Sequence, residues 1–310
     1  MRVLLALGGN AMTAKDGSAT PRAQITAITT AMESVADLVA EGHEVVLTHG
    51  NGPQVGNILV KNELAARVVP PVPLDWCGAQ TQGTIGFVAL NALDAAFAAR
   101  GLDKRVACLI TRTLVDADDE GFTTPTKPIG RYLPRDEAQE MIEHGQTWED
   151  RGERGWRRVV ASPDPHDVLE TDIIRTLVNA GYVVVAAGGG GIPVVREPSG
   201  RLRGVEAVID KDLTAAILAS ALEVDALVIA TDVDHAILDY GTDTARPIGR
   251  VRVTEMEEYA ATGQFASGSM GPKVEAALRF ARTGRRSIIT SLDHIVEAVD
   301  AGFGTVITDT

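Results

Sequence analysis

The 310-residue sequence is poor in several residue types, and each shortage excludes a class of protein. Cysteine occurs only at Cys77 and Cys108, far apart and without metal-ligand spacing, so we expect two reduced thiols and neither a disulfide framework nor a metal centre. No apolar run approaches membrane-spanning length, and the apolar start at residues 3–7 is too short for a signal peptide, which predicts a cytoplasmic location. The net charge of −13 argues against nucleic acid or an acidic membrane as a partner.

Lysine is also scarce, because most of the basic residues are arginine and lysine stands only at positions 15, 61, 104, 127, 211 and 273. Where arginine supplies the surface charge, a lysine inside a motif bounded by glycine, proline or aspartate indicates a need for a compact point charge. Lys127, Lys211 and Lys273 are placed in this way.

Two familiar phosphate-binding motifs are missing. The sequence contains no Gly-x-x-x-x-Gly-Lys-Ser/Thr, which argues against a Walker-type nucleotide hydrolase. Four glycines at 188–191 follow a strand, and Asp210 lies about 20 residues further on, as in a dinucleotide-binding fold. That fold, however, requires a third small residue where Pro193 stands, and a hairpin is predicted here in place of a helix.

What is present is a repeated pattern of buried strands that end in glycine or aspartate. The apolar residues 183–187 lead into Gly188, Gly189, Gly190 and Gly191; residues 4–7 into Gly8, Gly9 and Asn10; residues 45–48 into His49, Gly50, Asn51 and Gly52; and residues 227–231 into Asp232 and Asp234. Strands this uniformly apolar are typical of parallel sheets, whose carboxyl ends bind ligands. Bare backbone amides at those ends can close on an anion. We interpret His49 as a structural hydrogen-bonding residue in preference to a general base.

Strands and helices alternate along most of the chain, which predicts an α/β fold: a three-layer αβα sandwich around one mainly parallel sheet. Helices are expected from Pro21 to Gly42, from Pro53, over 75–100 and over 167–179. Glycines at 78, 83 and 86 would let another backbone approach the third helix, such as that of a subunit partner. We place the boundary between an N-terminal half, 1–180, and a C-terminal half, 181–310, just before the central strand.

Residues 116–160 depart from this alternation and are polar and rich in turns. We expect them to form a protruding lid subdomain, called the lid below, with a short helix near 136–144 and a strand at 158–161 that returns to the body. In the C-terminal half we expect a hairpin over 193–205, a helix over 213–222, paired strands at 236–240 and 250–253, and a helix over 274–283.

The three lysines indicate the chemistry. Phosphoryl transfer needs positive charge around the phosphoryl oxygens and in-line placement, and little else from the protein. Lys127 lies on a stiff loop between prolines, Lys211 is flanked by Asp210 and Asp212, and Lys273 stands at a helix start beside Gly271, where free amides attract phosphate.

Short segments along the whole chain carry a resemblance to a known family: LGGNA at 7–11, THGNGPQVG at 48–56, GAQTQG at 78–83, PTKPIG at 125–130, GWRRVV at 155–160, AVIDKD at 207–212 and GSMGPK at 268–273. Together they resemble the carbamate kinases of the amino-acid kinase superfamily. Related acetylglutamate kinases carry a lysine just before the first glycine pair, where this chain has Ala6 and Leu7. In carbamate kinases a lysine of the lid is thought to replace it, which suits Lys127.

The resemblance implies reversible phosphoryl transfer between ATP and carbamate, in arginine or related nitrogen catabolism, by a homodimer. It implies carbamate binding by Gly8, Gly9, Asn10, Gly50, Asn51 and Gly52, and catalytic roles for Lys127, Asp210, Lys211 and Lys273. Nucleotide binding is expected at Gly188, Gly189, Gly190, Asp232, Ser269, Met270, Gly271 and Lys273. Mg2+ is expected on the nucleotide phosphates and not on a protein site. An acetylglutamate- or aspartate-type kinase and a catalytically silent nucleotide sensor remain the alternatives.

Overall fold

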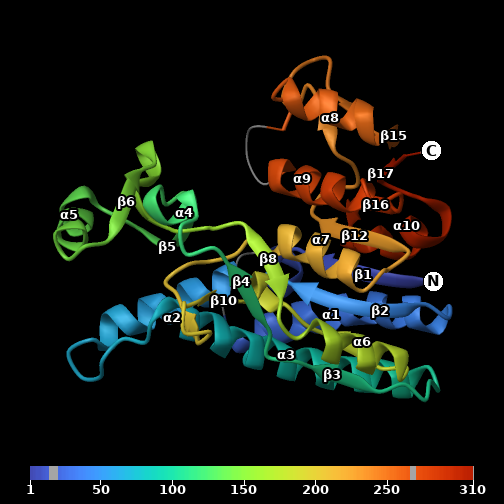
Figure 1. Ribbon diagram of the computed structural model, residues 1–310, viewed down its shortest axis with the longest axis horizontal. Coiled ribbons are helices and arrows are strands. Elements are labelled where there is room, and N and C mark those ends of the chain that lie inside the picture. Colours follow the sequence, from blue (N-terminus) through green and yellow to red (C-terminus); the bar gives the residue numbers. More distant parts are fainter. Residues whose placement is uncertain (14–19, 266–269, 310) are drawn as a thin grey trace.

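The computed structural model describes residues 1–13, 20–265 and 270–309 (Figure 1). In this described part, eight strands form a central sheet in the order β15-β17-β16-β12-β1-β2-β9-β3. Neighbouring strands are parallel except for the antiparallel pair β16 and β17. The strands are β1 (Arg2–Leu7), β2 (Glu44–His49), β3 (Val106–Cys108), β9 (Val183–Val185), β12 (Ala226–Thr231), β15 (Arg250–Arg252), β16 (Arg286–Ser291) and β17 (Thr305–Thr308).

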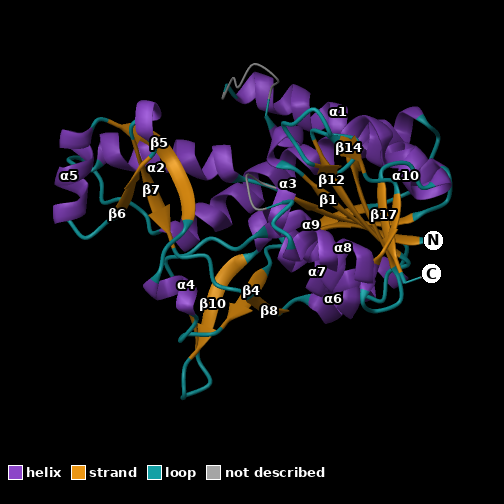
Figure 2. Cartoon of the chain, turned by 90° about the horizontal axis from the view of Figure 1, so that it is seen from above, coloured by secondary structure: helices purple, strands orange, loops and turns teal. Residues whose placement is uncertain are grey.

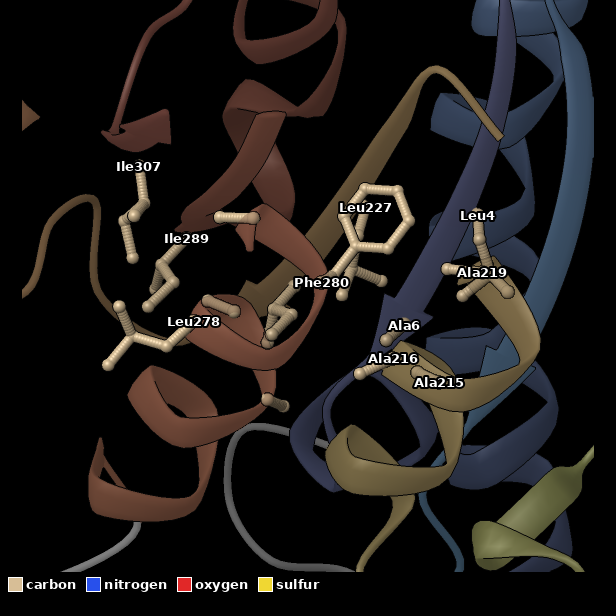
Figure 3. Close-up of a cluster of buried hydrophobic side chains, with 14 of the residues drawn as sticks. Leu4, Ala6, Ala215, Ala216, Ala219, Leu227, Leu278, Phe280, Ile289 and Ile307 are labelled. Carbon is tan, nitrogen blue, oxygen red and sulfur yellow. The ribbon is translucent and has the colours of Figure 1, made fainter. Parts of the chain in front are cut away.

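Helices cover both faces of this sheet (Figure 2). One face carries α1 (Pro21–Ala40), α3 (Leu74–Ala99) and α10 (Ile295–Ala301); the other carries α6 (Thr171–Asn179), α7 (Lys211–Ala221), α8 (Val253–Ala261) and α9 (Met270–Ala281). Because side chains alternate along a strand, Leu4 and Ala6 of β1 pack toward α7, whereas Val3 and Leu5 pack toward α1. Figure 3 shows the first of these two cores. The predicted three-layer αβα sandwich is confirmed.

Local signals explain where the first helix begins and ends. Thr20 Oγ1 accepts a hydrogen bond from Ala23 N at 3.3 Å, and Pro21 occupies the first turn. The chain leaves the helix at Gly42, whose φ of +88° suits glycine. The next helix, α2 (Gly52–Ala65), likewise has proline in its first turn.

A second sheet, absent from the sequence prediction of one sheet, lies beside the first. It contains β4 (Arg112–Val115), β8 (Pro165–Val168), β10 (Ile192–Arg196) and β11 (Leu202–Gly204), in the order β11-β10-β4-β8. The predicted hairpin over 193–205 is confirmed as β10 and β11. The helix expected over 167–179 begins only at Thr171, because residues 165–168 pair with β4 as an edge strand.

The lid stands away from the sheets, at the left of Figure 1. It contains α4 (Glu120–Thr123), β5 (Lys127–Leu133), α5 (Arg135–Glu143), β6 (Thr147–Asp150) and β7 (Trp156–Val160), and β7 pairs with both β5 and β6. The expected return strand at 158–161 was therefore wrong: most of it is the central strand of the lid's own sheet, and only Ala161 bridges to the body, at Ala207. Leu133, Ala138 and Trp148 give the lid a small core of its own.

The predicted pairing of 236–240 with 250–253 was also wrong. Short strand β13 (Ile237–Leu238) pairs with β14 (Arg246–Pro247), while β15 extends the central sheet beside β17. The helix expected over 274–283 begins earlier, at Met270. The division near residue 180 stays a prediction. No helix in the described ranges is both long and apolar enough to cross a membrane.

Candidate active site

The three lysines singled out by the sequence line one cavity of about 1290 Å³. They come from three elements: Lys127 begins β5 of the lid, Lys211 begins α7, and Lys273 lies in the first turn of α9. Ammonium groups from three separate segments of the chain therefore lie around one cavity.

Two carboxylates hold these ammonium groups. Lys127 Nζ lies 2.7 Å from Asp210 Oδ2, so the lid is joined to the body by an ion pair. Lys273 Nζ lies 3.1 Å from Asp212 Oδ2, and Lys211 pairs with the other oxygen of the same carboxylate. Asp212 thus bridges two lysines.

The start of α7 fixes both carboxylates in position. Asp210 is the N-cap residue, and its Oδ1 accepts hydrogen bonds from the backbone amides of Asp212 and Leu213 at 2.9 and 3.4 Å. Its second oxygen is thereby turned toward Lys127. The Asp-Lys-Asp sequence places a cap, a cation and a second carboxylate within one helical turn.

Burial and charge act against each other in this group. Burial has the largest effect on the pKa of Lys211 and lowers it, while the neighbouring Asp212 carboxylate opposes the change. Burial alone would raise the pKa of Asp212, but the charges of Lys211 and Lys273 outweigh it and the pKa is lowered. Two buried ammonium groups share one carboxylate, so the floor of the cavity carries an excess of positive charge suited to an anion.

The first two glycine turns meet at the edge of this cavity. Gly9, Gly50, Asn51 and Gly52 line it. A Cβ on Gly50 would lie 2.9 Å from Gly9 N, so the two turns are in direct backbone contact. The amides of Gly8 and Gly50 are already engaged, with Ala230 O at 2.9 Å and Leu7 O at 3.0 Å. Asn10 lies in the short helical turn Gly9–Met12.

The glycine run after β9 is required by close packing. A Cβ at Gly188, Gly189 or Gly190 would lie 2.4 Å from His49 Nε2, 2.1 Å from Asn51 Nδ2 or 2.6 Å from Ile209 O, respectively. Of these three glycines, Gly189 is the one found among the described residues that line the cavity. The run therefore lets the glycine turns and the Asp210 segment approach one another.

His49 is held inside this packing. Its Nδ1 lies 3.0 Å from Gly50 O, and burial lowers its pKa to about 4, so the imidazole is neutral at pH 7. This geometry agrees with the structural interpretation of His49. Asn51 is fixed in a similar way, because its Nδ2 donates to Thr81 Oγ1 at 2.8 Å.

The remaining predicted nucleotide residues are less uniformly placed. Gly271 and Lys273 line the cavity. Met270 packs against the core beneath α9, and Asp232, at the end of β12, accepts a hydrogen bond from Thr231 Oγ1 at 3.0 Å. Ser269 lies outside the described residues.

Comparison with known proteins finds relatives that match this chain over nearly its whole length. The model of the amino acid kinase family matches residues 1–291. The chain belongs to the amino acid kinase family. Among its relatives in this family are the carbamate kinase of Pyrococcus horikoshii, 43% identical with 99% of each chain covered, and the carbamate kinase-like protein YqeA of Escherichia coli, 44% identical with 99% of this chain and 98% of that one covered.

Solved structures resemble the fold of this chain closely. The carbamate kinase of Giardia lamblia bound to AMP-PNP is 41% identical, with a TM-score of 0.93, and the match covers 99% of this chain and 98% of that one. A protein of Aeropyrum pernix is 39% identical, with a TM-score of 0.95 and 99% of each chain covered. The resemblance stated from the sequence motifs is confirmed at the level of family and fold.

Asp212 is the residue whose importance the sequence analysis missed. The sequence indicated it only as a flank of Lys211, while the resemblance implied a catalytic role for Asp210. The sequence did contain a signal for this role. If Asp210 caps the helix, backbone amides occupy one of its oxygens, and only the other oxygen is left for a lysine. The remaining two of the three lysines then need a second carboxylate.

Proposed function

We propose that the chain is a carbamate kinase, which catalyses reversible phosphoryl transfer: ATP + carbamate = ADP + carbamoyl phosphate. The observation that carries the proposal is the meeting of Lys127, Lys211 and Lys273 in one cavity. It is supported by full-length similarity of about 43% identity to carbamate kinases.

In this proposal the lysines neutralise the phosphoryl group as it passes between two oxygens. Asp210 orients Lys127, and Asp212 orients Lys211 and Lys273. The excess positive charge of the buried group would stabilise the charge on the equatorial phosphoryl oxygens. No general base is required, because carbamate already presents an anionic oxygen.

We assign carbamate to the N-terminal half, 1–180, and the nucleotide to the C-terminal half, 181–310. For carbamate, the turns at Gly8, Gly9, Asn10 and at Gly50, Asn51, Gly52 would supply backbone amides. Because the amides of Gly8 and Gly50 are bonded within the protein, the role of donor falls to the others. For the nucleotide, Gly189, Gly271 and Lys273 line the cavity.

The carboxylates around the cavity bear on the expected Mg2+. Asp210, Asp212 and Glu275, all lining residues, are each paired with a lysine or arginine. Mg2+ commonly keeps several waters and binds through substrate phosphates with few protein ligands. The residues therefore fit an ion carried by the nucleotide phosphates, where it would neutralise charge on the transferred group.

A homodimer is part of the proposal. Trp76 and Phe87 of α3 are 60% and 64% exposed, and apart from the adjacent backbone of α3 no described atom lies within 4 Å of a Cβ position at Gly78 or Gly83. The helix thus offers apolar side chains and open space to a second copy. Gly86 has a different role from the one expected, since Cys108 of the same chain fills its space.

We place the enzyme in the cytoplasm and in arginine or related nitrogen catabolism.

The test is coupled ATP formation from ADP and carbamoyl phosphate with the purified chain and Mg2+. We expect ATP formation, and in the reverse direction ADP formation with carbamate but not with N-acetylglutamate or aspartate. Activity with one of those amino acids in place of carbamate would assign the site to another branch of the family. Nucleotide binding without turnover of any of them would indicate a sensor.

A further inference from the structure

A second, smaller hollow lies in the lid and is lined largely by arginine. It has a volume of about 310 Å³, and its walls are Pro128, Tyr132, Arg151, Arg154 and Arg157. Three guanidinium groups around one hollow are unexpected in a chain of net charge −13. Such a volume is large enough for a small ligand.

The positive charge of this hollow is only partly compensated. Arg151 Nη2 pairs with Glu149 Oε2 at 2.5 Å. Among the ion pairs of the described residues, none involves Arg154 or Arg157. Within the described part of the chain, two arginines therefore face one hollow without a carboxylate partner.

Arg157 is also held in place and incompletely bonded. Its guanidinium lies 5.0 Å from the centre of the Tyr132 ring, and its Nη1 donates to Tyr132 Oη at 3.3 Å. Its Nε is buried without a hydrogen-bond partner in the described part of the chain. Hydrogen bonds from Arg154, and then from Arg157, lower the pKa of Tyr132. The arginines around the hollow thus favour the negatively charged form of the Tyr132 oxygen over the neutral form.

We propose that Tyr132, Arg151, Arg154 and Arg157 form a binding site for a dianionic oxyanion of the phosphate class. Guanidinium groups bind phosphate oxygens through paired, charge-assisted hydrogen bonds. Pro128, Arg151 and Arg157 also line the large cavity, so the site lies at its margin. In an acidic protein, a local positive site of this kind would concentrate phosphate-bearing ions beside the cavity.

A substitution of Arg154 tests this site apart from the large cavity, because Arg154 lines the hollow and does not line the cavity. The test is calorimetric titration of inorganic phosphate into wild type, Arg154→Gln and a matched control, Arg135→Gln, which removes an exposed arginine of α5 in the same lid. We expect Arg154→Gln to weaken one class of phosphate sites about tenfold or more, as for loss of a charged hydrogen bond. Arg135→Gln should bind as wild type does. Identical isotherms for Arg154→Gln and wild type would overturn the proposal.

A spectroscopic measurement uses the phenol directly. Phosphate bound to Arg154 and Arg157 would reduce their effect on Tyr132, so phosphate should shift one tyrosine titration, followed by phenolate absorbance, to higher pH. The shift should be missing in Tyr132→Phe. A wild-type titration that phosphate leaves unchanged would count against the site.

A kinetic measurement identifies the source of the phosphate group. Of the three tests, this one depends on the proposed function, whereas the two titrations do not. If Arg154→Gln raises KM for carbamoyl phosphate and leaves kcat unchanged, the site receives the substrate's phosphate. If KM is unchanged while phosphate binding is weakened, the site serves free phosphate. Either result supports the site. A chain with no kinase activity would refute the proposed function and leave the binding test intact.

Discussion

Replacing Asp212 by asparagine tests how the lysine cluster is held. The wild-type carboxylate pairs with Lys211 and Lys273, and the side chains of Asp212, Lys211 and Lys273 are 4%, 12% and 9% exposed, respectively. Asp212→Asn leaves two buried ammonium groups without the carboxylate that pairs with both of them. Breaking a buried ion pair in this way costs roughly 3–5 kcal/mol of unfolding free energy.

Asp210→Asn is the matched control. It removes the carboxylate on the other side of Lys211, which pairs with Lys127. Asn caps a helix about as well as Asp, so the helix start is kept, and the Lys127 side chain is 38% exposed. An accessible pair of this kind contributes about 0–1 kcal/mol. We therefore expect Asp212→Asn to be less stable than Asp210→Asn by about 2 kcal/mol or more, measured by urea unfolding followed by circular dichroism. Equal losses would refute the view that the buried group depends on Asp212.

The pH dependence of the same variant is a second check. The folded pKa of Lys211 is below its ordinary 10.5, and Asp212→Asn removes a charge that raises it, so the folded pKa falls further. Between the folded and unfolded pKa values the unfolded chain binds more protons, so stability rises with pH. The stability gap between wild type and Asp212→Asn should therefore narrow as pH rises from the folded pKa of the variant to that of the wild type, both of which lie below 10.5. A gap that stays the same from neutral pH to pH 10.5, or that widens, would contradict this assignment.

Further predictions concern single sites. Lys211→Ala should lower turnover roughly 100-fold or more, the scale of losing one charge partner in the transition state, while circular dichroism stays native; near-normal turnover would remove Lys211 from the mechanism. Because burial lowers the folded pKa of His49 from 6.5 to about 4, the unfolded chain binds more protons in that window, and wild-type stability should rise by up to about 3 kcal/mol between those pH values. His49→Asn should lose this rise in urea unfolding series, and a retained rise would assign it to another group. Gly189→Ala should destabilise more than Gly200→Ala in thermal unfolding: both have positive φ, which costs about 1–2 kcal/mol, but only at Gly189 does the new Cβ meet a side chain, that of Asn51. Equal losses would mean that Asn51 moves away freely. Finally, ATP should slow tryptic cleavage within the lid if the lid closes on the nucleotide, and an unchanged cleavage rate would argue against closure.

Much of the fold follows from local patterns. The apolar runs at residues 4–7 and 227–231 predicted parallel strands, and both runs lie in buried, neighbouring strands of the central sheet. Pro21 and Gly42 predicted the limits of the first helix, because the start and end of a helix depend on residues close in sequence.

Pairing partners could not be predicted in the same way. Residues 156–160 have strand-forming side chains, but whether they join the body or the lid depends on β5 and β6, which are contributed by other segments of the chain. Strand β8 was missed for a related reason. It begins at a proline, Pro165, and β4 is its one partner among the described strands, so its pairing depends on a distant segment of the chain.

The site shows the same division. The lysines could be found because lysine is scarce. The cavity in which they meet is also lined by glycines that follow predicted strands, where the sequence predicted a ligand site. The glycine run at 188–191 was interpreted as an anion cradle, yet its first requirement is contact with His49, Asn51, Ile209 and Thr113. Sequence alone does not distinguish a glycine that faces a ligand from one that faces another segment, because both need the same missing side chain.

The ion pair between Lys127 and Asp210 gives the lid a tether whose strength depends on the solvent. It joins β5 to the cap of α7, and its lysine is partly accessible to water, so dissolved salt weakens the attraction. Raising the ionic strength should loosen the lid while leaving the buried Asp212 group largely unaffected. Solution composition thereby becomes a means of adjusting how often the cavity opens.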